Sequence, residues 1–132
     1  MDNIKIKQIS TGTPWEEIVG YSRAVRVGNQ IEISGSVAVD ESGQVVGRDD
    51  PEVQTRYILT RIAHILAELG AQLSDVIRTR IYVTDIANWE KVGRVHGEVF
   101  GEIKPVTSLV EVSALIGPEY LVEIEVTAVI GE

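Results

Sequence analysis

Carboxylates inside strand-like segments are the residues of this sequence best suited to chemistry. In PVTSLVEVSAL (105–115), Glu111 interrupts an apolar pattern, and in LVEIEVTAVI (121–130) Glu123 and Glu125 alternate with apolar residues. Successive side chains of a strand point to opposite faces, so Glu123 and Glu125 are predicted to share one face. A carboxylate in such a place pairs with a cation on a neighbouring strand or takes part in a polar site.

Cations are predicted on that same face. Arg78 and Arg80 lie in VIRTRIYVTDI, where residues 76–84 alternate between apolar and polar side chains. One interpretation is a solvated sheet face with ion pairs across its strands. The alternative is a face covered by another copy of the chain, with polar groups converging on a pocket at the contact. The predicted face carries Arg78, Arg80, Tyr82, Thr107, Leu109, Glu111, Glu123, Glu125 and Thr127.

Hydrophobic periodicity predicts the elements that would position these side chains. Asp50 can cap a long helix that Gly70 ends, and Asn88 can cap a second helix over 89–100. Gly28 tolerates positive φ and predicts a tight turn between the first two strands. The strands are predicted at 21–27, 30–39, 76–84, 105–115 and 121–130, with a short edge strand after Gly43.

The order of these elements predicts an α+β fold with a mixed sheet. Strand–helix–strand units favour right-handed crossovers and parallel pairing. The hairpin-like connections, at Gly28 and between the last two strands, are expected to add antiparallel pairs. Both helices can pack on one face of the sheet. The side chains predicted to face them are Ile77, Thr79, Ile81, Val83, Val110, Val112, Ile124 and Val126.

The composition excludes several classes of site. Cysteine is absent, which rules out disulfides, thiolate metal sites and a cysteine nucleophile. His96 and Glu98 give too few ligands for a metal site, which needs three or four. A net charge of −8 disfavours binding to phosphate backbones. The first ten residues lack the apolar run of a signal peptide, and no stretch is long enough to span a membrane, so we expect a cytoplasmic protein.

Three stretches resemble the Rid family, also called the YjgF or reactive-intermediate deaminase family: GYSRAVRVGNQIEISGSV, TRIYVTDIANWEKV and KPVTSLVEVSALIGPEYLVEIEVTAV. The resemblance covers residues 14–130, within a single domain that we assign to 1–132. It implies a chorismate-mutase-like α+β fold with two helices on one face of a mixed sheet. It also implies a homotrimer in which the sheets line a central barrel and small-molecule clefts lie between neighbouring subunits.

The resemblance implies an activity as well. Well-studied members hydrolyse enamines and imines left by pyridoxal-phosphate enzymes, releasing ammonia and a 2-keto acid without a metal or an organic cofactor. The glutamate that positions water and moves a proton there matches Glu123. The pocket tyrosine matches Tyr21, although the proline that precedes it in the family is missing here. The SGS segment is expected to contribute Gly35 and Ser36 to the pocket, and the alternative for Gly35 is a bulge in the strand.

The segment PVTSLVEV departs from the family pattern. The deaminase branch has a carboxylate-binding arginine and a cysteine where this sequence has Thr107 and Leu109, which are expected to line the cleft instead. A neutral hydroxyl binds a carboxylate more weakly than a guanidinium does, so we expect an altered substrate. Arg80 is the first choice for a replacement anion anchor, and Arg78 and Arg23 are further candidates. The alternative is that Arg80 forms a salt bridge to Glu111, Glu123 or Glu125.

Three functions follow from these observations. The first is a hydrolytic deaminase of small enamines or imines with Glu123 as the water-handling group. The second is a non-catalytic homotrimer that binds a small molecule. The third is RNA cleavage, an activity ascribed to some family members, and the net charge of −8 and the lack of a basic patch count against it.

Overall fold

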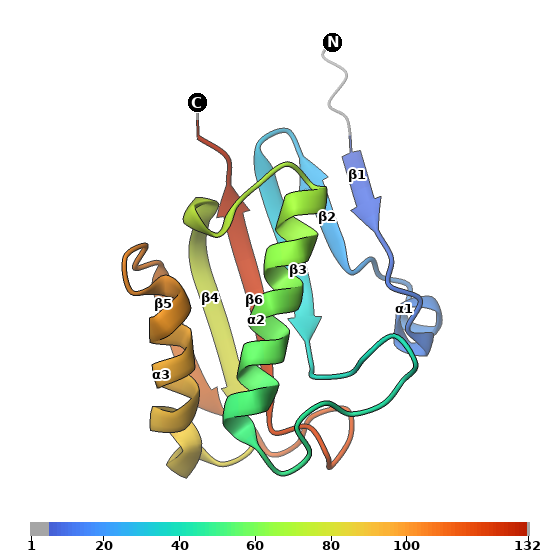
Figure 1. Cartoon of the computed structure of the whole chain (residues 1–132). Helices are drawn as coiled ribbons and strands as arrows, with labels where there is room; N and C mark the ends of the chain where they lie inside the picture. Colours follow the sequence, from blue (N-terminus) through green and yellow to red (C-terminus); the bar gives the residue numbers. More distant parts are fainter. Residues whose placement is uncertain (1–5, 132) are drawn as a thin grey trace.

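The computed structural model describes residues 6–131, which form one six-stranded sheet with three α-helices (Figure 1). The strand order is β1-β2-β3-β6-β4-β5, so the mixed α+β fold predicted from the sequence is confirmed. Residues 1–5, part of the segment searched for a signal peptide, lie outside the described part. The strands are β1 (Ile6–Ile9), β2 (Ala24–Val27), β3 (Gln30–Ser36), β4 (Val76–Val83), β5 (Val106–Glu111) and β6 (Val122–Val129). The helices are α1 (Pro14–Val19), α2 (Pro51–Glu68) and α3 (Trp89–Phe100), with 3-10 turns η1 (Leu73–Asp75) and η2 (Ile86–Asn88).

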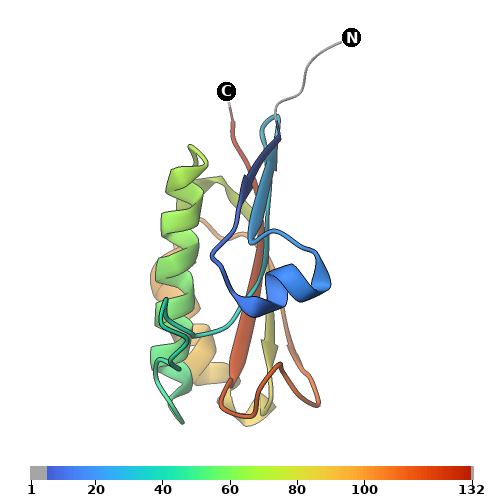
Figure 2. The same ribbon diagram turned by 90° about the vertical axis from the view of Figure 1, so that its right-hand side faces the viewer.

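Helices α2 and α3 lie side by side on the same face of the sheet, as Figure 2 shows with the sheet edge-on. The apolar side of α2, including Ile58 and Ile62, packs on the strands and is fully buried. Burying such a side chain contributes about 1.5–3 kcal/mol. The prediction that both long helices cover one face is confirmed. We call the face that α2 and α3 leave uncovered the open face.

The connections between strands are only partly as predicted. β2 and β3 form an antiparallel hairpin whose turn contains Gly28 at φ 61°, and β4 and β5 are parallel across α3. The prediction that the last two strands, β5 and β6, form an antiparallel pair is wrong. β6 instead lies between β3 and β4 and is antiparallel to both. The last strand therefore occupies the middle of the sheet, and β5 is an edge.

The alternation of β6 and β4 determines the two faces. Ile124 and Val126 face the helices, opposite Ile81 and Thr79 of β4, and all four are buried. The open face carries the polar partners, as predicted: Tyr82 opposite Glu123, Arg80 opposite Glu125, and Arg78 opposite Thr127. The prediction that Ile77 faces the helices is wrong, because the register shifts between Val76 and Arg78 and leaves Ile77 50% exposed.

The predicted sidedness of β5 is wrong. Parallel pairing puts Thr107 beside Thr79 and Leu109 beside Ile81, so both lie on the helix-covered face. Val110 points the other way and is 45% exposed. This strand has apolar residues in both phases of its alternation, so the pattern alone selected the wrong face. Its neighbour in the sheet, not its own sequence, decides which side chains are covered.

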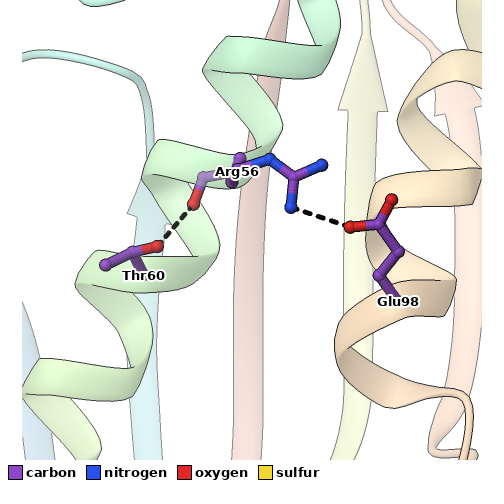
Figure 3. Close-up of polar contacts among 3 residues, drawn as sticks. All are labelled: Arg56, Thr60 and Glu98. Atoms are coloured by element: carbon purple, nitrogen blue, oxygen red, sulfur yellow. Dashed lines mark hydrogen bonds and ion pairs between the residues drawn. The ribbon is translucent and has the colours of Figure 1, made fainter.

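Helix α2 begins and ends at the predicted signals, whereas the predicted Asn88 cap of α3 makes no side-chain capping hydrogen bond. The Asp50 carboxylate accepts hydrogen bonds from the N–H groups of Glu52 and Val53, and Gly70 follows α2 at φ 82°. An ion pair joins α2 to α3 on their exposed sides: Arg56 Nη1 lies 2.8 Å from Glu98 Oε2 (Figure 3). The same figure shows Thr60 donating to the Arg56 carbonyl one turn away.

Two elements were not predicted, and one prediction was too strong. β1 extends the sheet beyond β2, and α1 follows it. The expected edge strand after Gly43 is only an isolated bridge between Val39 and Val45. Across residues 6–131, no helix has both the length and the apolar character needed to cross a membrane.

Candidate functional site

A cavity of about 670 Å³ lies where α1, the loop after β3 and the loop before β6 meet the sheet. It combines a charged lining with an apolar and aromatic one. The charged side chains that line it are Arg23, Asp40, Glu41, Arg61, Glu123 and Glu125. The apolar and aromatic ones are Pro14, Trp15, Tyr21, Val37, Val39, Ile65, Ile116 and Tyr120. Such a volume and mixture of groups are typical of a small-molecule site.

Glu123 enters this cavity from the open face of β6. Its carboxyl group packs against Gly35, where an added Cβ would come within 2.8 Å of Glu123 Cδ. Burial, and then the charge of Glu125, raise the pKa of Glu123, and Arg23 opposes them. No hydrogen bond from the described part of the chain stabilises the ionised form. A carboxyl group of this kind exchanges a proton closer to neutral pH than an ordinary glutamate does.

Arg23 holds the other charge of the site. Its side chain lines the cavity although the residue is only 6% exposed. Nη1 donates to the Gly35 carbonyl at 2.6 Å and to Ser36 Oγ at 3.3 Å, and Nη2 donates to Tyr21 Oη at 3.3 Å. Four predicted site residues, Tyr21, Gly35, Ser36 and Glu123, are therefore brought together, and Arg23 is the group that connects them.

The backbone of β3 explains why a glycine stands at this point. The pairing of β3 with β6 is regular up to Ile33 and resumes at Ser36 after a register shift. The irregular residues, Ser34 and Gly35, turn their carbonyl groups to Arg23 Nη1. Because Gly35 has no Cβ, the Glu123 carboxyl group can lie directly against it. The bulge thus positions the cation and the carboxylate together.

The α1 wall of the cavity is held by a second glutamate, Glu16, which is 5% exposed. Its two carboxylate oxygens accept hydrogen bonds from the hydroxyl groups of Ser10, Thr11 and Thr13 at 2.7–3.0 Å. The N–H groups of Thr11 and Thr13 also donate to it. Burial raises the pKa of Glu16, but these hydrogen bonds together lower it to about 2. Thr11 and Thr13 line the cavity, so Glu16 fixes this wall.

Arg80 lies outside the lining of the cavity. Its Nε is 3.8 Å from Glu125 Oε1, which is the salt bridge that the sequence left as the alternative. Glu125 also accepts a hydrogen bond of 2.6 Å from Tyr82 Oη. That hydrogen bond and burial raise the pKa of Tyr82. The predicted anion anchor is therefore engaged with a carboxylate on the open face.

Thr107 and Leu109 also lie away from this cavity, since β5 turns them to the helix-covered face. Thr107 Oγ1 is 2.8 Å from Thr79 Oγ1, which in turn is 2.9 Å from His96 Nε2. Burial lowers the pKa of His96, whose ring packs on Phe100 with centroids 4.7 Å apart. These residues form a small polar cluster between β5 and α3.

Sequence reasoning missed the aromatic wall of the cavity, although a signal was present. Thr13-Pro14-Trp15-Glu16 matches the pattern of a helix start, with a threonine cap, proline at the first position and glutamate at the third. That helix brings Trp15 to Tyr120, where the rings meet edge to face at 6.2 Å. Tyr120 precedes β6, and no local pattern predicts this contact. Among the residues that the structure places, no three His, Cys, Asp or Glu side chains gather as metal ligands would.

Comparisons with known proteins agree with this architecture. The Endoribonuclease L-PSP family model matches residues 12–130. The 3-aminoacrylate deaminase RutC of Acinetobacter baylyi is 35% identical over 113 residues, which are 86% of this chain and 88% of the relative. A RutC family protein of Pyrococcus abyssi is 40% identical over 109 residues, covering 82% and 84% of the two chains.

A solved structure from Mycobacterium tuberculosis, described as a member of the YjgF family, superposes with a TM-score of 0.86. It is 48% identical and covers 96% of this chain and 100% of that one. A Rid family protein from Yersinia pestis gives a TM-score of 0.83 at 33% identity, with 96% and 100% covered. The resemblance seen in the sequence is therefore confirmed over nearly the whole chain. The protein belongs to the Rid, or YjgF, family, to which the Endoribonuclease L-PSP model also corresponds.

Proposed function

We propose that this protein is a hydrolytic deaminase of small enamines or imines and that Glu123 handles the attacking water. The observation that carries the proposal is the Glu123 carboxyl group, which lies in the cavity with a raised pKa and accepts no hydrogen bond from residues 6–131. It is available both to water and to substrate. The similarity to a 3-aminoacrylate deaminase supports this reaction class, because 3-aminoacrylate is itself an enamine.

The reaction consists of proton transfers, the addition of one water molecule and the loss of ammonia. An enamine first becomes an iminium ion by taking a proton from solvent on its β-carbon, the carbon next to the one that bears nitrogen. Water then adds to the C=N carbon while the Glu123 carboxylate accepts a proton from it. The resulting carbinolamine receives that proton on nitrogen, the C–N bond breaks and ammonia leaves, and the hydroxyl group releases its proton to solvent as it becomes the carbonyl. A carboxyl group whose pKa is raised towards neutrality suits both directions of transfer.

We also propose that the protein works as a homotrimer whose open sheet faces meet. The open face has exposed apolar side chains, including Val106 at 57% and Val110 at 45%, between its charged residues. Large exposed apolar side chains gathered on one face are typical of protein contacts. Light scattering is expected to give about three times the chain mass of 14.5 kDa. A stable monomer would contradict this part of the proposal.

The activity can be tested with an imine made in place. A serine dehydratase supplies 2-aminoacrylate, and added protein should accelerate release of pyruvate and ammonia beyond the rate in buffer. Glu123→Gln keeps the shape of the side chain and should remove the acceleration, whereas Glu98→Gln, at an exposed carboxylate of α3 outside the cavity, should retain it. No acceleration by the wild type with several amino-acid-derived imines would overturn the deaminase proposal and favour a binding protein.

RNA cleavage is less well supported, although the matching family model carries an endoribonuclease name. The cavity is lined by four carboxylates, Asp40, Glu41, Glu123 and Glu125, against two arginines. With a net charge of −8, this lining disfavours a polyanion.

A further inference from the structure

Arg23 is a buried cation without an ion pair in the described part of the chain, although its charge acts at longer range on Glu123. At 6% exposure, its guanidinium has no carboxylate within ion-pair distance among residues 6–131, where the ion pairs involve Arg56, Arg80 and Arg94. A charge removed from water without a counter-charge is costly. A bound anion would compensate it.

The hydrogen bonds of Arg23 leave donors for such a ligand. A guanidinium has five N–H donors. Nη1 uses its two on Ser34, Gly35 and Ser36, and Nη2 uses one on Tyr21. The Nε proton and the second Nη2 proton have no acceptor in the described part of the chain. In the described part of the chain, every fully buried side-chain nitrogen has a hydrogen-bond partner. Because Arg23 Nε has none, it is not fully buried and solvent reaches it.

The other arginines near the site are less suited to this role. Arg61 lines the cavity but is less buried than Arg23; its Nη1 donates to the Val39 carbonyl at 3.1 Å and to Tyr57 Oη at 3.2 Å, and its charge acts on Asp40. Arg80 does not line the cavity, and its Nε faces the Glu125 carboxylate. Arg23 alone among these three combines burial, unused donors and a place beside Glu123.

The remaining lining indicates what accompanies the anion. The Trp15–Tyr120 pair, together with Ile65, Ile116 and Val37, forms an apolar wall in the same cavity. A volume of about 670 Å³ is far larger than a three-carbon substrate needs. The cavity therefore suits a molecule with one anionic end and a bulky apolar group.

We propose that Arg23 binds the carboxylate of a 2-imino acid with a bulky aliphatic or aromatic side chain, and that this side chain packs on Trp15 and Tyr120. The reacting imine in this assignment rests on the proposed function, but the carboxylate and the apolar group do not. The imine carbon then lies beside Glu123, on the same side of the cavity as Arg23. Arg23 thus takes the role of an anion anchor.

Binding of unreactive keto acids tests the anchor without catalysis. By calorimetry, 4-methyl-2-oxopentanoate should bind the wild type about tenfold more tightly than its uncharged amide. It should also bind about tenfold more tightly than pyruvate, which lacks the bulky group. Equal affinity for acid and amide would overturn the role of Arg23, and equal affinity for pyruvate would overturn the apolar wall. These comparisons use the unaltered protein, so they do not depend on the folding of a variant.

Two variants locate the effect. Arg23→Gln should remove the preference for the acid over the amide, and Arg80→Gln, the matched control, should keep it. Preservation of the preference in Arg23→Gln would overturn the assignment. If the wild type binds the keto acid as expected but accelerates no imine hydrolysis, the proposed function fails and the anchor stands. If it hydrolyses imines but does not distinguish acid from amide, the anchor fails and the function stands.

Discussion

Glu16 and Glu123 are two carboxylates beside one cavity with opposite surroundings. Glu16 receives five hydrogen bonds from Ser10, Thr11 and Thr13, and its pKa falls to about 2. Glu123 receives none from residues 6–131, and burial with Glu125 raises its pKa. Glu16 is an ionised carboxylate that stabilises the fold, and Glu123 is a carboxyl group that is free to accept a proton. Hydrogen-bond donors, more than burial, make the difference.

The largest expected effect is the loss of folding stability in acid that depends on Glu16. A pKa of about 2 in the folded state, below the usual 4.5, stabilises the protein above pH 4.5. That contribution, about 3 kcal/mol, is lost as pH falls from 4.5 through 2. Glu16→Gln should cost a comparable amount at pH 7 and flatten the acid limb of a denaturation curve. An unchanged acid limb would contradict the view of Glu16 as an ionised anchor.

Gly35→Ala should displace the Glu123 carboxyl group without unfolding the protein. Its Cβ would collide with the Glu123 carboxyl group, which ends a flexible side chain and can move aside. Imine hydrolysis is expected to fall by about tenfold or more, with a stability loss of about 1 kcal/mol. Gly97→Ala is the control, because a Cβ there meets nothing and should stabilise α3 by about 0.5–1 kcal/mol. Full activity in Gly35→Ala would show that the carboxylate position is unimportant.

Glu123→Gln should stabilise the protein at neutral pH, opposite in sign to Glu16→Gln. A raised folded pKa means that ionisation of Glu123 opposes folding, and this cost is absent below the unfolded pKa. The gain should therefore appear in melting curves at pH 7 and vanish on acidification below pH ~4. A destabilised Glu123→Gln at pH 7 would mean that the carboxylate has structural partners after all.

The Arg56–Glu98 pair provides the smallest expected effect and a reference for surface charge (Figure 3). Both side chains are more than half exposed, at 55% and 58%. Water and salt screen such pairs. A double-mutant cycle with alanine at both positions should give a coupling close to zero that disappears at high salt. A large, salt-resistant coupling would show that α2 and α3 depend on this contact.

The sequence predicted those features that local patterns determine. The caps at Asp50 and Gly70, the helical spacing of α2 and the alternation of β6 all specify their structures directly. The capping pattern at Thr13 and Glu16 was equally local but was overlooked.

The remaining features depend on contacts between distant segments. The register of β5 with β4 decides which side chains of β5 face the helices, and the sequence around Leu109 does not indicate that register. Arg23 and Glu123 are 100 positions apart, and only the insertion of β6 beside β3 brings them to one cavity. Arg80 was preferred as the anion anchor because of the sheet face on which it lies, and that face was predicted correctly. Its side chain is paired with Glu125 on the neighbouring strand instead.

The central position of β6 also governs when the chain can fold during synthesis. Residues 24–83 contain β2, β3, α2 and β4, yet β3 and β4 have no hydrogen-bonded contact until Val122–Val129 enters between them. While the ribosome still holds that segment, two unpaired strand edges remain exposed on the nascent polypeptide. Native folding of this sheet therefore waits until residues 122–129 have left the ribosome, and termination before residue 122 leaves two halves that cannot join.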